Sequence, residues 1–92
     1  MEKRVKYWIL SCLSQCEGDK GEDVKKMFEQ KPDFVTDDLA RFFKLLLELE
    51  GSGLVKFVNE TEDPHFKITK EGKKNLHEYM KNANIKDVFK CA

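Results

Sequence analysis

The stretch that decides the fold runs from residue 53 to residue 72 and reads GLVKFVNETEDPHFKITKEG. Two runs of strand-forming residues, 54–58 and 65–69, flank a polar segment that contains Asp63-Pro64, which is typical of a hairpin loop. In the second run, apolar and polar side chains alternate, as a half-buried strand requires. Thr69 then stands where a helix N-cap is expected. The sequence therefore predicts a β-hairpin that leads directly into a helix.

The segment before the hairpin, residues 37–50, is predicted to form a helix with a wide apolar arc. Thr36 is the expected N-cap, and Gly53 allows a sharp turn from the helix into the hairpin. The side chains expected on the apolar arc are Leu39, Phe42, Phe43, Leu45, Leu46, Leu47 and Leu49. A narrow polar strip remains on this helix, and it consists of Asp37, Arg41, Lys44 and Glu48.

Other segments show the helical spacing of apolar side chains. Helices are predicted over residues 2–16, 22–30, 70–82 and, as a short C-terminal helix, 84–91. In the first of these, Tyr7 and Leu10 fall off the apolar stripe, and they lie either at the edge of the core or against a partner. The predicted order is helix, helix, helix, strand, strand, helix. This is an α+β fold, mainly α with a small β-hairpin.

Composition and cysteine content bound the protein class. The 92 residues, 40% apolar and 37% charged, predict one domain over residues 1–92 with a core at about residues 5–80. No apolar run approaches the roughly 20 residues that cross a bilayer. Cys12 and Cys16 lack C-x-x-C spacing, and no His or Cys cluster completes a zinc site. We expect a cytoplasmic protein without a signal peptide, a metal or a cofactor.

Two segments, LARFFKLLLELEGSGLVKF and FKITKEGKKNL, together follow a pattern known from other proteins. Together they resemble the second half of a winged-helix (winged helix-turn-helix) domain of the kind found in MarR- and PadR-type transcriptional regulators. The matching positions are Leu49, Glu50, Gly53, Leu54, Val55, Phe66, Ile68, Thr69 and Gly72. The resemblance extends over about residues 5–80 and is strongest over residues 39–76. It is a pattern of the fold rather than of one protein family.

The resemblance implies double-stranded DNA as the partner, with the third helix in the major groove and the hairpin, or wing, along the backbone. The residues it implies at the DNA are Thr36, Arg41, Lys44, Lys56, Lys67, Lys70 and Lys73. Arg41 has the chemistry to read guanine, and Lys44 to reach a phosphate or a base. The alternative for both is a solvated helix face, paired with nearby Asp and Glu.

The resemblance also implies a homodimer, because many regulators of this kind pair through their first and last helices. The residues expected at that interface are Tyr7, Leu10, Ile85, Val88 and Phe89. The last three either pack across a twofold axis or return onto the first helix.

The charge distribution favours a second function. Residues 17–64 hold seven basic and thirteen acidic side chains, a net charge of −6, whereas DNA binding depends on neutralising phosphates. The wing adds Glu60, Glu62 and Asp63 near its tip. The alternative is therefore a winged-helix protein-interaction module that does not bind DNA. An enzyme is not expected, since the chain has no glycine-rich phosphate loop, nucleophile elbow or metal-ligand cluster.

Overall fold

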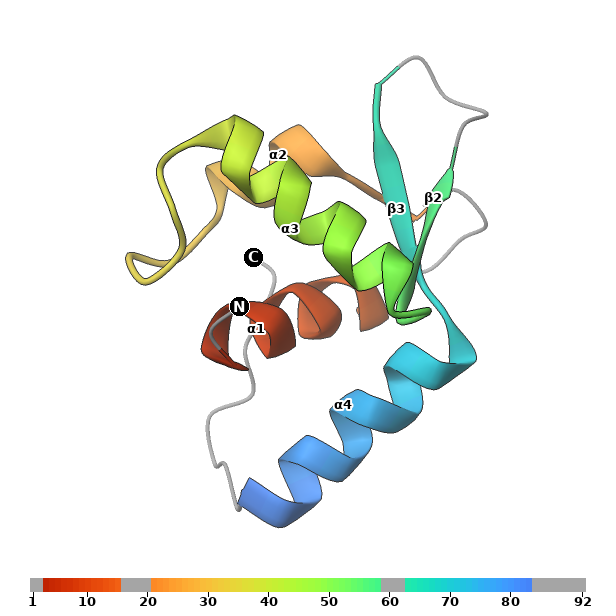
Figure 1. The fold of residues 1–92 in the computed structure, drawn as a ribbon. Coiled ribbons are helices and arrows are strands. Elements are labelled where there is room, and N and C mark those ends of the chain that lie inside the picture. Colours follow the sequence, from red (N-terminus) through yellow and green to blue (C-terminus); the bar gives the residue numbers. More distant parts are fainter. Residues whose placement is uncertain (1–2, 16–20, 59–62, 84–92) are drawn as a thin grey trace.

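The computed structural model has an α+β architecture with four helices and a three-stranded antiparallel sheet in the residues that it describes, 3–15, 21–58 and 63–83. The elements are α1 (Lys3–Ser14), β1 (Glu22–Asp23), α2 (Val24–Glu29), α3 (Leu39–Gly51), β2 (Val55–Val58), β3 (His65–Ile68) and α4 (Lys70–Ala83). In Figure 1, α1 crosses beneath α3, the hairpin stands beside α3, and α4 runs away below. This arrangement is compatible with a winged-helix fold.

The sheet differs from the prediction by one strand. Its order is β1-β3-β2, and β1 pairs with β3 through Glu22 opposite Phe66 and Asp23 opposite His65. The prediction placed these two residues in the helix 22–30, because so short a strand carries no periodic signal, whereas α2 begins at Val24. Consequently β3 is the central strand of the sheet.

The start of α3 also differs from the prediction. Its N-cap is Asp38, whose carboxylate accepts the backbone N–H groups of Ala40 (3.0 Å) and Arg41 (3.4 Å). The expected cap, Thr36, lies two residues earlier, where its hydroxyl accepts the N–H of Asp38 at 3.2 Å. The prediction chose the wrong member of three adjacent capping residues, Thr36, Asp37 and Asp38. The predicted C-terminal helix, 84–91, lies outside the described residues.

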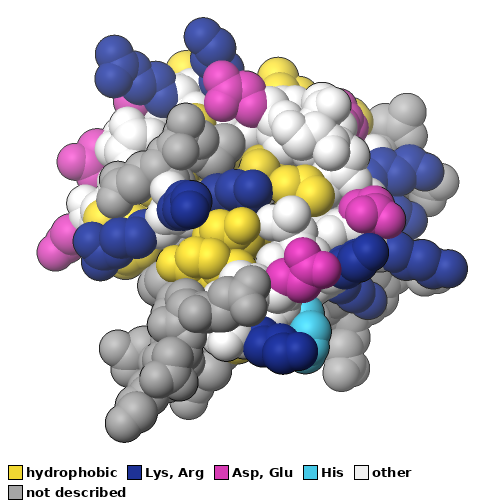
Figure 2. Space-filling model, turned by 60° about the horizontal axis from the view of Figure 1, so that its bottom comes forward, with side chains coloured by type: hydrophobic (Ala, Val, Ile, Leu, Met, Phe, Trp, Pro, Cys, Tyr) yellow, Lys and Arg dark blue, Asp and Glu magenta, His cyan; other side chains and the backbone are white. Residues whose placement is uncertain are grey.

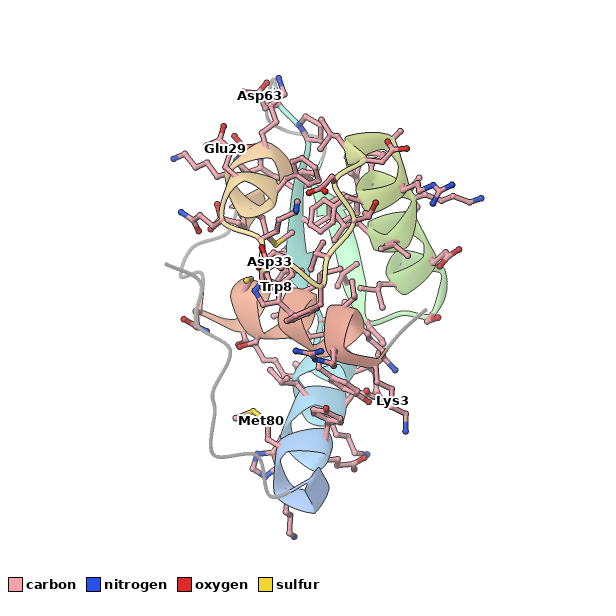
Figure 3. All side chains as sticks on the ribbon, turned by 90° about the vertical axis from the view of Figure 1, so that its left-hand side faces the viewer. Lys3, Trp8, Glu29, Asp33, Asp63 and Met80 are labelled. Atoms are coloured by element: carbon pink, nitrogen blue, oxygen red, sulfur yellow. The ribbon has the colours of Figure 1, made fainter. Side chains whose placement is uncertain are left out.

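Helix α1 is buried on nearly every side. Its buried side chains are Val5, Tyr7, Trp8, Ile9, Leu10, Ser11, Cys12 and Leu13. Helix α4 and strand β3 both pack against it, which accounts for burial beyond the single predicted stripe. Figure 3 shows Trp8 in the interior of the molecule. The core is therefore built around α1.

Aromatic contacts join the three predicted helical segments to the sheet. The Phe42 ring lies 6.1 Å from Trp8 and 5.3 Å from Phe28, measured between ring centroids. On the sheet side, Phe66 is fully buried and lies 5.8 Å from Phe43 in an edge-to-face arrangement. Such pairs stabilise a core beyond the area that they bury. These contacts fix α3 against the inner face of the hairpin.

The joint between α3, the hairpin and α4 depends on Gly53, Thr69 and Gly72. Gly53 has φ +80°, a conformation that favours glycine. Thr69 donates its hydroxyl hydrogen to the Gly53 carbonyl (2.7 Å) and accepts the Gly72 N–H (3.0 Å), so its predicted capping role is confirmed. A Cβ on Gly72 would stand 2.1 Å from the Leu54 carbonyl oxygen, so only glycine fits there.

Glu50 has a role in the hairpin that the sequence did not reveal. Its carboxylate accepts the backbone N–H of Phe57 at 2.8 Å. Phe57 belongs to β2, which is an edge strand, and this N–H points away from β3. The side chain thus satisfies a backbone donor at the open edge of the sheet.

Candidate nucleic-acid interface

The outer face of α3 carries the two side chains predicted to meet DNA. Arg41 and Lys44 are both exposed. The side chain of Arg41 is 80% exposed and has a 3.9 Å contact with Asp38, at the limit of an ion pair. Lys44 forms no ion pair or hydrogen bond with the part of the chain that the structure describes. Both cations are therefore open to an external anion.

The N-terminus of α3 is less available to a phosphate. Asp38 occupies the N–H groups of Ala40 and Arg41 that an anion would otherwise accept. Asp37 stands beside it with a 97% exposed side chain and pairs with Lys31. A DNA contact by α3 would therefore depend on its side chains rather than on its first backbone groups.

The loop between α2 and α3 is held by two cations that the sequence did not single out. The Lys31 side chain is only 15% exposed, and its ammonium donates to the Val35 carbonyl at 3.3 Å. At the same loop, the Arg4 guanidinium lies 4.2 Å from the centroid of the Phe34 ring. These contacts fix the loop that sets the direction of α3.

The lysines of the hairpin do not join Arg41 and Lys44 on one face. Lys56 and Lys67 are direct partners in the β2–β3 register. Side chains alternate along a strand, so both leave the sheet on the face opposite to Phe57 and Phe66, where α3 does not pack. The predicted basic residues are therefore divided between the outer face of α3 and the face of the hairpin that points away from α3.

The remaining predicted DNA-binding residues lie elsewhere. Lys70 and Lys73 are exposed on the first turn of α4, and Thr36 is half-buried in the loop before α3. On the face shown in Figure 2, Lys and Arg side chains are scattered among acidic and hydrophobic ones, and some of them lie among the hydrophobic side chains at the centre. Of the wing-tip acids, Asp63 is described and exposed, whereas Glu60 and Glu62 lie outside the described residues.

The predicted dimer residues have intramolecular contacts where the structure describes them. Leu10 is fully buried. Tyr7 stacks on Tyr79 of α4, with ring centroids 3.6 Å apart, and its hydroxyl donates to Asn75 at 3.0 Å. These contacts account for both side chains within one chain, and a dimer through them stays a prediction. Ile85, Val88 and Phe89 lie outside the described residues.

Two leucines of the predicted apolar arc of α3 are exposed. Leu39 is 41% exposed and Leu47 is 44% exposed, whereas Phe42, Leu46 and Leu49 are buried. Leu39 and Leu47 lie two helical turns apart, and the half-buried Phe43 stands between them. The width of the apolar arc in the sequence did not show which of its side chains would be exposed in the folded chain.

Other kinds of site find no support among the described residues. No group of three or more His, Cys, Asp or Glu there is placed to hold a metal ion. None of the helices in residues 3–15, 21–58 and 63–83 has the length and apolar character needed to span a membrane. Cys12 is fully buried, and His77 is exposed on α4.

Comparison of the chain with protein-family models, curated proteins and solved structures gives no match.

Proposed function

We propose that this chain is a winged-helix protein that binds double-stranded DNA and acts as a small dimeric transcriptional regulator. The observation that supports the proposal is the outer face of α3, where Arg41 and Lys44 are exposed and not neutralised by close ion pairs. Helix α2 precedes α3 through a loop held by Lys31, and the hairpin packs beside α3 through Phe43 and Phe66. In this proposal α3 enters the major groove and the hairpin lies along the backbone.

The roles of the two side chains follow from their chemistry. Arg41 presents a planar fork of donors that suits a bidentate contact with guanine. Lys44 lies three residues further along the same helix and supplies a point charge for a phosphate. In this proposal the hairpin lysines, Lys56 and Lys67, contact the phosphate backbone of the DNA from the face of the sheet opposite to Phe57 and Phe66.

The proposal is tested by measuring duplex affinity at a series of salt concentrations. Fluorescence anisotropy with a generic duplex should show steep weakening with salt, and Lys44→Ala should reduce the slope of log K against log salt by about 0.9. Arg41→Ala should weaken binding to a sequence selected from a random duplex library by about 1–3 kcal/mol.

Lys81→Ala is the matched control. Lys81 is an exposed lysine in the last turn of α4, and its removal should leave both the affinity and the salt slope close to those of the wild type. No binding to any duplex at low salt would contradict the proposal. Equal losses in the Lys44 and Lys81 variants would remove α3 from the interface.

A second function, a protein-interaction module, is favoured by the exposed leucines of α3. Leu39 and Leu47 would place apolar surface of a winged helix against another protein or a second copy. Arg41 and Lys44 lie on the same helix, so a partner seated there would exclude DNA from α3.

The double variant Leu39→Gln, Leu47→Gln separates the two functions. If α3 associates with a second copy, sedimentation equilibrium should show weaker self-association in this variant. If α3 binds DNA, the salt slope should persist, because neither leucine carries charge. Self-association that depends on these leucines, together with no duplex binding, would favour the interaction module.

A further inference from the structure

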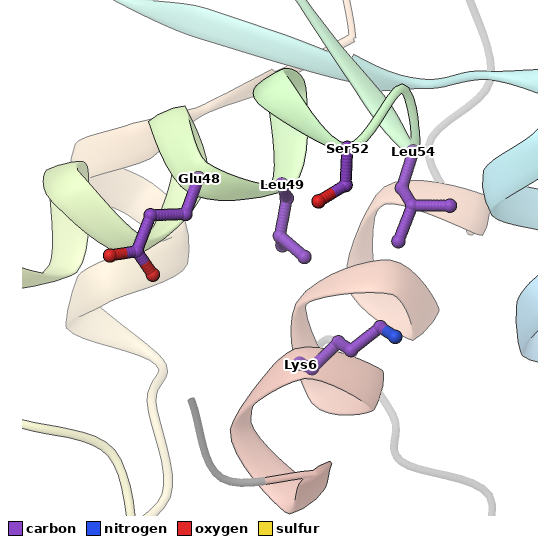
Figure 4. Close-up of a pocket in the computed structure, with 5 residues that line it drawn as sticks. All are labelled: Lys6, Glu48, Leu49, Ser52 and Leu54. Atoms are coloured by element: carbon purple, nitrogen blue, oxygen red, sulfur yellow. The ribbon is translucent and has the colours of Figure 1, made fainter.

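A half-open cleft lies between α1 and the C-terminal end of α3. Its volume is about 290 Å³, and it is lined by Lys6, Glu48, Leu49, Ser52 and Leu54. This volume is near the lower end for ligand cavities, so it suits a small molecule. Figure 4 shows that the lining comes from α1 on one side and from the end of α3 and the turn after it on the other.

The polar groups of the cleft are not used by the fold. Within the described part of the chain, neither Lys6 nor Glu48 forms an ion pair, and the Ser52 hydroxyl has no hydrogen-bond partner. The Lys6 ammonium lies 5.0 Å from the centroid of the Tyr7 ring, which leaves its N–H donors for other acceptors. The cleft thus combines a cation, an anion and a hydroxyl that are all open.

The apolar part of the cleft is rigid. Leu49 and Leu54 are 3% and 8% exposed, so each shows only a small part of its surface to the cleft. The Leu54 N–H donates to the Leu49 carbonyl at 3.0 Å, which fixes the two residues relative to each other. In Figure 4 the Glu48 carboxylate and the Lys6 ammonium lie toward opposite ends, with Leu49 between them.

We propose that this cleft binds a short zwitterion that carries its ammonium and its carboxylate at opposite ends, such as a dipeptide with an aliphatic side chain. The ligand ammonium pairs with Glu48 and the ligand carboxylate pairs with Lys6. The Ser52 hydroxyl bonds the peptide group, and the aliphatic side chain lies on Leu49 and Leu54. A single-charge ligand would leave one of the two side chains without a partner.

This site is independent of the proposed DNA binding. It lies at the C-terminal end of α3, and its recognition groups include neither Arg41 nor Lys44. Failure of the duplex experiments would leave it unaffected.

The test is a titration of the ¹⁵N-labelled full chain with L-alanyl-L-leucine, followed by NMR. Saturable shifts are expected at the backbone amides of Leu49, Ser52 and Leu54. N-acetyl-alanyl-leucine lacks the ammonium, and alanyl-leucinamide lacks the carboxylate. Each analogue should bind up to about five-fold more weakly than the dipeptide, the range expected of a half-exposed ion pair.

Charge-removing variants connect each ligand group with one side chain. Glu48→Gln should bind the dipeptide and its N-acetyl analogue equally, and Lys6→Gln should bind the dipeptide and its amide equally. The controls Lys81→Gln and Glu71→Gln, both exposed on α4, should keep the wild-type preferences. The proposal is overturned by an absence of saturable shifts, by shifts confined to other elements, or by a Glu48 variant that still prefers the free ammonium.

Discussion

Helices α1 and α3 look alike in the sequence but occupy opposite situations in the molecule. Both carry many apolar side chains, and α3 has the wider apolar arc. Nevertheless α1 is buried from Val5 to Leu13 except at Lys6, whereas α3 is buried at Phe42, Leu46 and Leu49 and exposes Leu39 and Leu47.

This contrast shows that burial follows the number of neighbours and not the number of apolar residues. Helix α1 lies between α4, β3 and α3, so side chains in every direction meet another element. Helix α3 meets α1, α2 and the hairpin on one side and has an open side. The buried side chains of α1 therefore serve stability, whereas the residues of the proposed DNA contact, Arg41 and Lys44, lie on the exposed part of α3.

The largest expected effect tests the contrast directly with one kind of residue. Leu10→Ala removes a fully buried side chain and should lower the free energy of unfolding by about 2–5 kcal/mol, through lost burial and the cavity left behind. Leu47→Ala removes a side chain that is 44% exposed and should change it by less than about 1 kcal/mol. Urea denaturation followed by far-UV circular dichroism measures both, and similar losses would break the comparison.

Two glycines, Gly51 at the end of α3 and Gly72 in α4, extend the comparison of buried and exposed positions to the backbone. Gly72→Ala would push a Cβ against the Leu54 carbonyl and should destabilise the chain by about 1–3 kcal/mol. Gly51→Ala meets nothing within 4 Å and should leave stability unchanged or raise it by up to about 1 kcal/mol, because alanine favours a helix. Thermal unfolding should show a lower Tm for Gly72→Ala and an equal or higher Tm for Gly51→Ala, and a Gly72 variant as stable as the wild type would contradict the described joint.

The N-terminus of α3 provides a smaller effect. Asp38→Ala removes the cap and should lower the free energy of unfolding by about 1 kcal/mol, whereas Asp38→Asn keeps a capping side chain and should remain close to the wild type. Chemical denaturation distinguishes these results.

The same pair of variants connects stability with the proposed function. Asp38→Asn removes a negative charge beside Arg41 while keeping the cap, so anisotropy should show tighter binding to a generic duplex. Unchanged affinity would indicate that DNA does not approach this end of α3.

The smallest expected effect concerns the polar edge of α1. Tyr7→Phe keeps the stack on Tyr79 and removes the hydrogen bond to Asn75, which should lower the free energy of unfolding by about 0.5–1.5 kcal/mol. Tyr79→Phe is the control, since its hydroxyl has no partner among the described residues. Equal effects of the two substitutions would mean that the hydrogen bond contributes nothing measurable.

The sequence predicted most elements of the fold because their signals are local. The alternation of Phe66 and Ile68, the cap at Thr69 and the turn at Gly53 all depend on a few adjacent residues, and the structure agrees at each. The short strand β1 left no such signal. The prediction named Thr36 instead of Asp38 as the N-cap of α3, because three adjacent side chains can all accept a backbone N–H.

The candidate site was less predictable because it depends on how distant elements meet. Arg41 and Lys44 were expected to be exposed, and they are. Spacing along the chain did not show that Lys56 and Lys67 leave the hairpin on the other face, since this follows from the strand register. Nor did spacing along the chain show that Lys6 and Glu48 line one cleft, because this requires α1 to pass beneath the end of α3.

The carboxylate of Glu50 also has a consequence for the behaviour of the protein in concentrated solution. An incoming β-strand from another molecule would seek the unpaired donors along β2, and it would find the Phe57 N–H already occupied. The opposite margin of the sheet, β1, has only two residues and provides little template for a foreign strand. Among the described residues, strand addition is therefore disfavoured at Phe57 of β2 and along the two-residue β1.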